Sequence, residues 1–423
     1  MSSMHERVRE ELVVGGSTSN GLEGNGLENN ASSDAGGSRA ALFAIALVAL
    51  LVWLGINNIW TLVFVVGLLV SIFLHEVGHF VTARKTGMKV TQFFMGFGPR
   101  LWSRQKGEVE YGARAIPLGA FVRIIGMNSV DEVAPEDEHL AYRNKSYPRQ
   151  LLVITAGSVM HMAIAFVLFF GVYVFAGRFT ESGKVEVLRA PAVGSPAEAA
   201  GIQEGDIIKS FNGVNLSTRD DLIKVITSKS PGEIVTIIVG RNQQELTVTA
   251  TLASNPLDAQ VGYLGVGSAS TDYVKQGVLE AAGHSVGDIA RTVVNSVRGV
   301  VMALNPANSI RALQNPNENL ETRPTTVVGA SQVGGQLGKE DGLKAVLLLL
   351  ASVNVFVGVF NMFPLLPFDG GHAAIATYER IRSRAGRRYR ANVNKMIPLT
   401  TLVMGLLGVL LFVGLYLDIT NPL

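Results

Sequence analysis

The sequence predicts a polytopic α-helical membrane protein of four or five transmembrane helices, with a membrane-associated β-hairpin and an inserted β-rich domain. Three observations lead to this prediction. The 423-residue chain is 48% hydrophobic and only 17% charged, a balance typical of membrane proteins and unusual in soluble enzymes. Several apolar runs are long enough to cross a bilayer. One long polar region, Gly177 to Gly342, separates the second long run from the third.

Composition also excludes several classes of site. The chain has no cysteine, so a disulfide framework, thiolate metal ligands and a cysteine nucleophile are all ruled out. A metal ion must therefore be held by histidine, aspartate, glutamate or water. The net charge of +2 is too small to suggest a nucleic-acid partner, and we expect none.

The N-terminal residues 1–40 are rich in glycine, serine and asparagine and lack apolar periodicity. They predict a disordered tail, and so long a polar stretch before the first apolar run argues against a signal peptide. The first apolar run, Ala41–Leu54, is short and ends at Gly55-Ile56-Asn57-Asn58. It is either a fifth span joined by a tight turn or an interfacial helix, and we favour a span.

Longer apolar runs predict four transmembrane helices, at Thr61–Ala83, Leu151–Phe175, Val346–Phe368 and Ile397–Leu417. Charges between them predict the orientation. Arg84 to Arg149 carries 11 basic and 7 acidic residues, and Thr377–Lys395 carries 7 basic and 1 acidic, whereas Gly177 to Gly342 carries 14 basic and 17 acidic. Since basic loops stay in the cytoplasm, the first two are predicted inside and the third outside. With five spans, the tail is cytoplasmic and the C-terminus external.

An H-E-x-x-H motif, His75-Glu76-Val77-Gly78-His79, lies within the apolar stretch from Trp60 to Val81. On a helix this spacing places two imidazoles on one face, where they can share a zinc ion, and the glutamate can take a proton from the attacking water. Ionisable residues at membrane depth are costly and need a functional reason. The motif therefore predicts a metalloprotease whose active site lies in the bilayer.

A hydrolytic zinc usually has three protein ligands, and Asp369 is the best candidate for the third. Pro364 and Pro367 precede it and cannot continue a regular helix. Gly370 and Gly371 follow it and allow backbone conformations that other residues resist. An unwound segment with a carboxylate is tolerated at membrane depth only inside protein or beside water. The alternative is an aspartate that caps a helix at the interface.

The long polar region contains a β-rich unit, about Lys184 to Ala253, with strands predicted around two short helices. Its pattern S-P-A-x-x-A-G-I-x-x-G-D-x-I, starting at Ser195 and followed by Asn212-Gly213, resembles a PDZ domain. Such domains bind an extended peptide or chain terminus at a sheet edge, although a spacer that binds nothing is the alternative. The segment Tyr273–Leu304 is amphipathic and suits the outer membrane surface.

These features together resemble the site-2 protease family of intramembrane zinc metalloproteases. The residues that carry the resemblance are the H-E-x-x-H motif, an N-x-x-P-x-x-x-x-D-G segment that starts at Asn361, and the PDZ pattern. The pattern is most similar to the bacterial regulator-of-sigma-E type, in particular its actinobacterial members. It covers roughly residues 62–417 and is weak over 270–325. The implied divisions are the tail 1–40, an N-terminal membrane part 41–176, an extracytoplasmic PDZ domain 184–267, a connector 268–343 and a C-terminal membrane part 344–423.

The resemblance implies roles for particular residues. It assigns a zinc ion (Zn2+) to His75, His79 and Asp369 and the general base to Glu76. Asn361 matches a family asparagine thought to hold the substrate or polarise its carbonyl. Gly119, Ala120 and Phe121 match a β-hairpin that dips into the membrane and binds substrate. Residues 109–115 and 120–125 indeed predict two strands joined by a Pro-Leu-Gly turn, whose free edge could hold an unwound substrate.

Two positions depart from the family pattern. Gly119-Ala120 stands where a pair of glycines is common, which restricts the turn. Where relatives often have G-P-x-x-N, this chain has Gly157-Ser158-Val159-Met160-His161. His161 is then a fourth zinc ligand, a hydrogen-bond donor in the transition state, or a packing residue. His372 is predicted to support a ligand from behind or to lie at the interface.

The implied function is cleavage of transmembrane segments in regulated intramembrane proteolysis, in the bacterial plasma membrane, with the active site near the cytoplasmic side. Expected partners are membrane lipid and single-span substrates resembling anti-sigma factors, first shortened outside by another protease. The PDZ domain would capture the new C-terminus or exclude intact substrates by size. Alternatives are housekeeping clearance of remnant signal peptides, a non-catalytic PDZ scaffold that lacks part of the site, and a zinc transporter with ligands at several depths.

Overall fold

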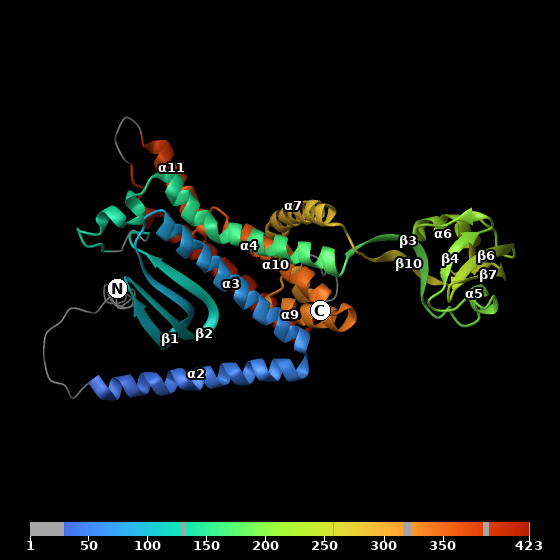
Figure 1. Ribbon diagram of the computed structural model, residues 1–423, viewed down its shortest axis with the longest axis horizontal. Helices are drawn as coiled ribbons and strands as arrows, with labels where there is room; N and C mark the ends of the chain where they lie inside the picture. Colours follow the sequence, from blue (N-terminus) through green and yellow to red (C-terminus); the bar gives the residue numbers. More distant parts are fainter. Residues whose placement is uncertain (1–28, 128–131, 257, 316–322, 384–388, 423) are drawn as a thin grey trace.

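The computed structural model describes residues 29–422 except 128–131, 257, 316–322 and 384–388. Long helices form the middle of the molecule, the β1–β2 sheet and α11 lie at one end, and a β-rich unit lies at the other (Figure 1). The long helices are α2 (Asn29–Asn57), α3 (Ile59–Lys85), α4 (Tyr147–Phe175), α7 (Val278–Ala303), α10 (Leu343–Asn361) and α12 (Ile397–Thr420). Shorter helices are α8 (Pro306–Gln314), α9 (Val327–Asp341) and α11 (Asp369–Arg382), with single turns at Glu138–Leu140, Tyr142–Asn144 and Val393–Met396.

Within the described residues, four helices are long and apolar enough to cross a membrane: α3, α4, α10 and α12. They confirm the four longer predicted spans, but the third ends at Asn361 instead of Phe368, because the chain unwinds ahead of Pro364 as its prolines predict. By length and composition, these helices indicate a membrane protein. The apolar part of α2, Leu42–Asn57, is shorter than a span.

The N-terminal prediction is corrected in part. Helix α2 begins at Asn29, so the segment 29–40, predicted to be disordered, has a helical backbone, and residues 1–28 lie outside the described part. The predicted turn between α2 and α3 is confirmed. Asn58 there accepts a hydrogen bond from the Trp60 amide at 3.0 Å and caps α3.

Helices α3, α4 and α10 form the centre of the membrane part. Phe64 and Leu68 of α3 pack with Val346 and Leu350 of α10 in a buried apolar cluster. Helix α4 approaches α3 closely at Gly78, where a Cβ atom would lie 2.8 Å from the carbonyl oxygen of Ala156. This close crossing brings the backbone of α4 against the H-E-x-x-H turn.

Helix α9 contains the glycine-rich stretch that precedes α10, and its glycines pack against the start of α3. A Cβ atom on Gly334 would lie 3.0 Å from the Phe64 ring, and one on Gly338 would collide with the Trp60 side chain. The N-terminus of α9 is capped by Asp418 of α12, whose carboxylate accepts bonds from the amides of Thr326 and Gly329 at 2.8 and 3.0 Å. Both α3 and α12 are thereby attached to α9.

The β1–β2 sheet differs from the predicted hairpin. Strands β1 (Val90–Lys106) and β2 (Val109–Ile124) are long and bent. Gln92 to Met95 pairs on one side with residues 120–123 and on the other with 110–113, and residues 102–106 pair with 109–113. Residues 109–115 and 120–125 therefore do not form a hairpin with each other, because the first half of β1 lies between them. The segment 120–124 forms one edge of the sheet.

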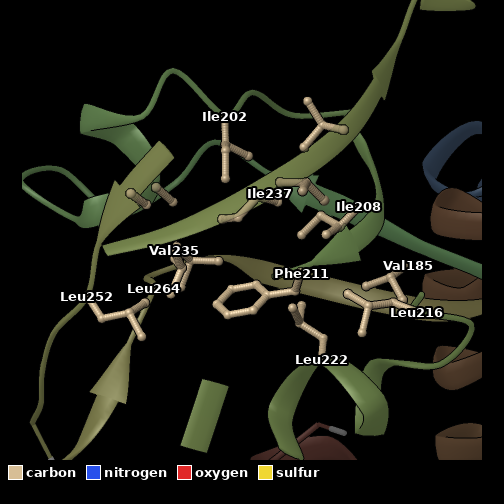
Figure 2. Close-up of a cluster of buried hydrophobic side chains, with 14 residues drawn as sticks. Val185, Ile202, Ile208, Phe211, Leu216, Leu222, Val235, Ile237, Leu252 and Leu264 are labelled. Atoms are coloured by element: carbon tan, nitrogen blue, oxygen red, sulfur yellow. The ribbon is translucent and has the colours of Figure 1, made fainter. Parts of the chain in front are cut away.

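The β-rich unit is built from a six-stranded sheet, a separate two-stranded sheet of β8 and β9, and two short helices. Its strands are β3 (Arg178–Arg189), β4 (Ile207–Phe211), β5 (Val214–Asn215), β6 (Ile234–Arg241), β7 (Gln244–Thr251), β8 (Ala253–Asn255), β9 (Asp258–Tyr263) and β10 (Gly267–Val274), and its helices are α5 (Pro196–Ala199) and α6 (Arg219–Thr227). The sheet order is β10-β3-β4-β6-β7. Phe211 lies at the centre of a separate apolar core with Ile208, Leu222 and Ile237 (Figure 2). The strands and helices predicted between Val185 and Leu252 are confirmed.

Pairing of β3 with β10 continues to Arg178 and Val274, past the boundaries predicted at 184 and 267, and forms the neck to the membrane part (Figure 1). Asp288 of α7 holds this neck by accepting bonds from Tyr173 Oη at 2.8 Å and Arg178 Nε at 3.1 Å. Burial alone would raise the pKa of Asp288, but these bonds hold it below its usual value. Tyr173 lies in the last turn of α4, so the neck is fixed to that long apolar helix.

Candidate metal centre

Two histidines of α3 face one another across a single helical turn. His75 and His79 are each only 6% exposed, and their Nε2 atoms lie 3.1 Å apart. The i, i+4 spacing places both rings on the face of α3 that α4 covers. This geometry confirms that the motif is helical and that its two imidazoles converge.

Asp369 joins the two histidines from a different part of the chain. It is the first residue of α11, which begins after the turn formed by residues 362–368. Its Oδ2 atom lies 3.5 Å from His75 Nε2 and 3.3 Å from His79 Nε2. Among the described histidine, aspartate and glutamate side chains, these three form the group that could hold a metal ion.

The donor set fits tetrahedral zinc. Ligand distances of about 2.0–2.1 Å require donor atoms about 3.3–3.4 Å apart, and the three donor pairs here are 3.1, 3.3 and 3.5 Å apart. Asp369 Oδ2 and His75 Nδ1 are buried atoms without a hydrogen-bond partner in the described residues. Buried polar atoms rarely remain unpaired, and a metal ion would satisfy the aspartate oxygen.

Glu76 lies beside the donor triangle and outside it. Its Oε1 atom is 4.0 Å from His75 Nε2, and its carboxylate faces the backbone of Val122 in the edge segment of β2. A carboxylate at this distance can reach a water molecule near the donors without displacing one of them. Glu76 therefore stands between the candidate metal position and a strand edge.

The two histidines differ in how their other ring nitrogen is held. His79 Nδ1 donates to the carbonyl oxygen of Val153 in α4 at 2.8 Å, which leaves Nε2 free to coordinate. His75 Nδ1 has no such partner. Its ring instead contacts the ring of His161, with centroids 5.0 Å apart.

The residues predicted to bind substrate lie outside the group of three donors. Asn361 ends α10 and is half-buried, and the hydrogen bonds of the described residues do not connect it to the three donors. Ala120 and Phe121 lie in the β2 edge segment, where Phe121 stacks on Phe94 at 5.5 Å. Gly119 has a φ of +140°, a conformation that favours glycine.

His161 and His372 are both near the donors but outside the triangle. His161 is buried in α4 against His75. His372 lies one turn after Asp369 and lines a cavity of about 240 Å³ with Tyr142, Gln150 and Glu379. Burial lowers the pKa of His372 from its ordinary value, which disfavours the charged imidazolium.

Sequence reasoning missed three residues that shape the centre. Gly157 lies where any Cβ atom would collide with both histidines. Asn354 and Ser71 form buried hydrogen bonds behind His161. One signal was present for Asn354: an asparagine within an apolar span needs a partner.

Known proteins resemble this chain over most of its length. Residues 63–405 match the model of peptidase family M50. The zinc metalloprotease Rip1 of Mycobacterium tuberculosis is 32% identical over 399 residues, 85% of this chain and 97% of that protein. Its counterpart in Mycolicibacterium smegmatis is 34% identical, over 86% and 98% of the two chains.

A comparison with solved structures finds matches to a small part of the chain. The PDZ domain of an SdrC-like protein from Listeria monocytogenes is 18% identical and covers 22% of this chain and 92% of its own, with a TM-score of 0.19. The family model, by contrast, spans both membrane parts and includes all four residues of the candidate centre. The chain belongs to peptidase family M50 and is a zinc metalloprotease.

Proposed function

We propose that His75, His79 and Asp369 hold the zinc ion and that Glu76 is the general base for peptide hydrolysis. The single observation that carries this proposal is the convergence of three donor atoms at 3.1–3.5 Å with Glu76 beside them. Bound zinc supplies Lewis acidity and lowers the pKa of water toward neutrality. Glu76 accepts the proton of the attacking water and delivers it to the leaving amine nitrogen.

Substrate is proposed to bind as an extended strand along the edge segment 120–124. The supporting observations are that, among the described residues, this segment pairs with β1 on one side only, and that Val122 faces Glu76. An edge strand offers unpaired amide and carbonyl groups to an added strand. A peptide bond held there is freed from helical hydrogen bonds and lies beside the base. Asn361, at the end of α10, is proposed to hold the substrate or polarise its carbonyl.

The reaction is proposed to take place within the membrane, near its cytoplasmic side. His75 and His79 lie in the last three turns of α3, which ends in the basic pair Arg84 and Lys85. Basic residues also dominate the neighbouring loops, which by the positive-inside rule stay in the cytoplasm. The β-rich unit lies at the opposite end of the molecule (Figure 1), and we place it outside the cytoplasm.

Single-span membrane proteins of the anti-sigma-factor type are the proposed substrates, in regulated intramembrane proteolysis at the bacterial plasma membrane. The β-rich unit is proposed to bind the peptide or new C-terminus that an earlier external cut creates. The sheet edge at β10 supports this role, since β3 is its one pairing partner among the described strands.

Mapping the scissile bond tests this function. Purified protein in detergent would be incubated with a single-span substrate in two forms, with and without its external domain, and the products identified by mass spectrometry. A cut within the span, faster for the shortened form, supports the proposal. A cut confined to the soluble parts would contradict the intramembrane site. Preference for a remnant signal peptide over both forms would favour the housekeeping role.

A further inference from the structure

His75 differs from most metal-bound histidines because its second ring nitrogen is not fixed. Ligand imidazoles almost always donate that N–H to a carboxylate, carbonyl or water, which sets the ring's orientation. His79 does so through Val153, whereas His75 Nδ1 is buried without a hydrogen-bond partner among the described residues. Something else must hold the His75 ring.

The ring of His161 is the group that contacts it. The two centroids are 5.0 Å apart with the planes tilted by 43°, within the range of favourable ring contacts. His161 is 1% exposed. No Cβ atom intervenes, because the residue of α4 against both zinc-site histidines is Gly157. The buried ring of His161 thus packs against one side of the His75 ring.

His161 is itself anchored by a chain of hydrogen bonds across three helices. Its Nδ1–H donates to Asn354 Oδ1 in α10 at 2.8 Å. Asn354 Nδ2 donates to Leu350 O at 2.8 Å and to Ser71 Oγ of α3 at 3.1 Å, and Ser71 Oγ donates to Gly67 O at 2.9 Å. Asn354 is fully buried, so these bonds are protected from competition with water.

Close packing of α10 on α4 keeps these hydrogen-bonded side chains in place. A Cβ atom on Gly358 would lie 3.1 Å from His161 Cβ and 3.3 Å from the carbonyl oxygen of Ser158. Helix α10 can therefore approach α4 at the level of His161 only with glycine there. The donor triangle does not include His161, which argues against its being a fourth ligand.

We propose that His161, anchored by Asn354, is a positioning residue that orients the ligand His75. This inference rests on the proposed zinc site and deepens it. It explains why a histidine can stand where the related pattern has asparagine: the ring supplies the contact, and the Asn354 bond fixes the ring. Its effect should be seen first in metal binding, before any effect on the chemistry of hydrolysis.

The test measures metal affinity and ligand geometry in the full-length protein in detergent. Zinc affinity would be obtained by chelator competition, and the visible absorption of cobalt-substituted protein would report the coordination geometry. The variants are His161→Ala, Asn354→Leu, the two combined, and His161→Phe with Asn354→Leu. Ser352→Ala is the control, since Ser352 also lies in α10 and its hydroxyl bonds the local Leu348 carbonyl at 3.0 Å.

We expect His161→Ala and Asn354→Leu each to weaken zinc binding by about 10- to 100-fold and to shift the cobalt bands. Asn354→Leu should have no further effect once His161 is alanine, because it acts through that ring. The pair His161→Phe with Asn354→Leu should recover much of the affinity, since it restores a ring without unpaired polar groups. Ser352→Ala should match the wild type.

Two results would overturn the inference while leaving the zinc site intact. One is wild-type affinity and cobalt bands in His161→Ala. The other is an equal loss from Asn354→Leu whether or not His161 is present, which would indicate a general packing role. Failure of the wild-type protein itself to bind zinc would instead refute the proposed function.

Discussion

Gly157 shows how much of the metal centre depends on one residue of α4. Its Cα lies against the imidazoles of His75 and His79, where a Cβ atom would collide with both rings. The hydrogen bond from His79 to Val153 is also made to α4. The centre is therefore assembled between helices, and the H-E-x-x-H helix alone does not define it.

Gly157→Ala should abolish or greatly weaken zinc binding. Two ligands cannot both keep their positions beside the added methyl group, so the loss of affinity should exceed the roughly 10- to 100-fold typical of losing a hydrogen-bond partner behind a ligand. Zinc content after purification, measured by elemental analysis, checks this. Gly171→Ala is the control in the same helix, since a Cβ there meets nothing within 4 Å. Equal zinc content in the two variants would contradict the close packing.

Asp206 in the β-rich unit gives a prediction for acid stability. Its buried carboxylate receives Arg241 Nε and Nη2, each at 2.7 Å. Burial alone would raise the pKa of Asp206, but these bonds hold it below its usual value. Because the pKa of Asp206 is lower in the folded protein than in the unfolded chain, its pair with Arg241 stabilises the folded unit fully above about pH 4, the pKa of an aspartate in an unfolded chain. This stabilisation is lost as the pH falls from there toward the lower pKa of the folded state.

Asp206→Asn should therefore destabilise the β-rich unit by about 1–3 kcal/mol at neutral pH, since it removes the charge from a buried carboxylate that accepts two hydrogen bonds from the half-buried Arg241. Hydrogen exchange of the β4 and β6 amides in the full-length protein measures this. The wild type should lose protection below about pH 4 more steeply than the variant. If protection falls with pH equally in the wild type and in Asp206→Asn, the Asp206–Arg241 pair does not stabilise the unit.

At the residue scale, the sequence was sufficient to predict which three donor side chains converge, but not the residues that support them. His75, Glu76 and His79 follow from a short-range motif, and Asp369 from an unwound segment that bears a carboxylate. The contacts of Gly157, Ser71 and Asn354 depend on how three helices are rotated about their axes. That rotation is set by packing over the whole membrane part, which no local pattern encodes.

Glycines also determine how α9 meets α3. The face of α9 that contains Gly334, Gly335 and Gly338 lies on Phe64, Thr61 and Trp60 of α3. Small residues allow helix backbones to approach closely in membranes. Asp418 holds the start of the same helix to α12. We infer that α9 is a structural element that fixes the start of α3 relative to the last span.

Gly338→Ala should lower stability by about 1–3 kcal/mol, because the methyl group overlaps the Trp60 side chain. Gly405→Ala in α12 is the control, since a Cβ there meets nothing within 4 Å. Alanine favours helix over glycine, so the control should be neutral or slightly stabilising. Thermal unfolding midpoints in detergent measure the difference. A stabilising Gly338→Ala would refute the close packing of α9 on α3.

At the element scale, local signals predicted most strands and helices but not their pairing. Residues 109–115 and 120–125 are strands as expected, yet the first half of β1 lies between them. A short Pro-Leu-Gly link suggests a hairpin on local grounds, and only the long-range register reveals the insertion. The early end of α10 was foreseen from Pro364, although the apolar run continues to Phe368.

At the scale of the whole molecule, the candidate centre and the β-rich unit lie far apart along the long axis. The unit is joined through the β3–β10 neck, which Asp288 ties to the end of α4. His75 and His79 lie in the last three turns of α3, and that helix ends beside β1 and β2, on the side of the molecule away from the unit (Figure 1). Spans and loop charges were readable from the sequence, because membrane insertion depends on composition. The side of the membrane on which each end lies is a proposal from those charges.

Single cysteines test this orientation, since the natural chain contains none. Val193→Cys lies in the β-rich unit at a site 93% exposed, and Glu108→Cys lies between β1 and β2, where the side chain is 69% exposed. A membrane-impermeant maleimide applied to intact cells should label the first and spare the second until the membrane is opened. Labelling in the reverse order would invert the proposed topology.

The most direct test of the central claim is a comparison of the wild type with Glu76→Gln. Zinc content and cleavage of one single-span substrate would be measured on the same samples. Because Glu76 lies outside the donor triangle, the variant should keep its zinc and lose at least a hundredfold of its activity, as expected for removal of a general base. Cleavage that survives the substitution, or a wild type that binds no zinc, would contradict the account.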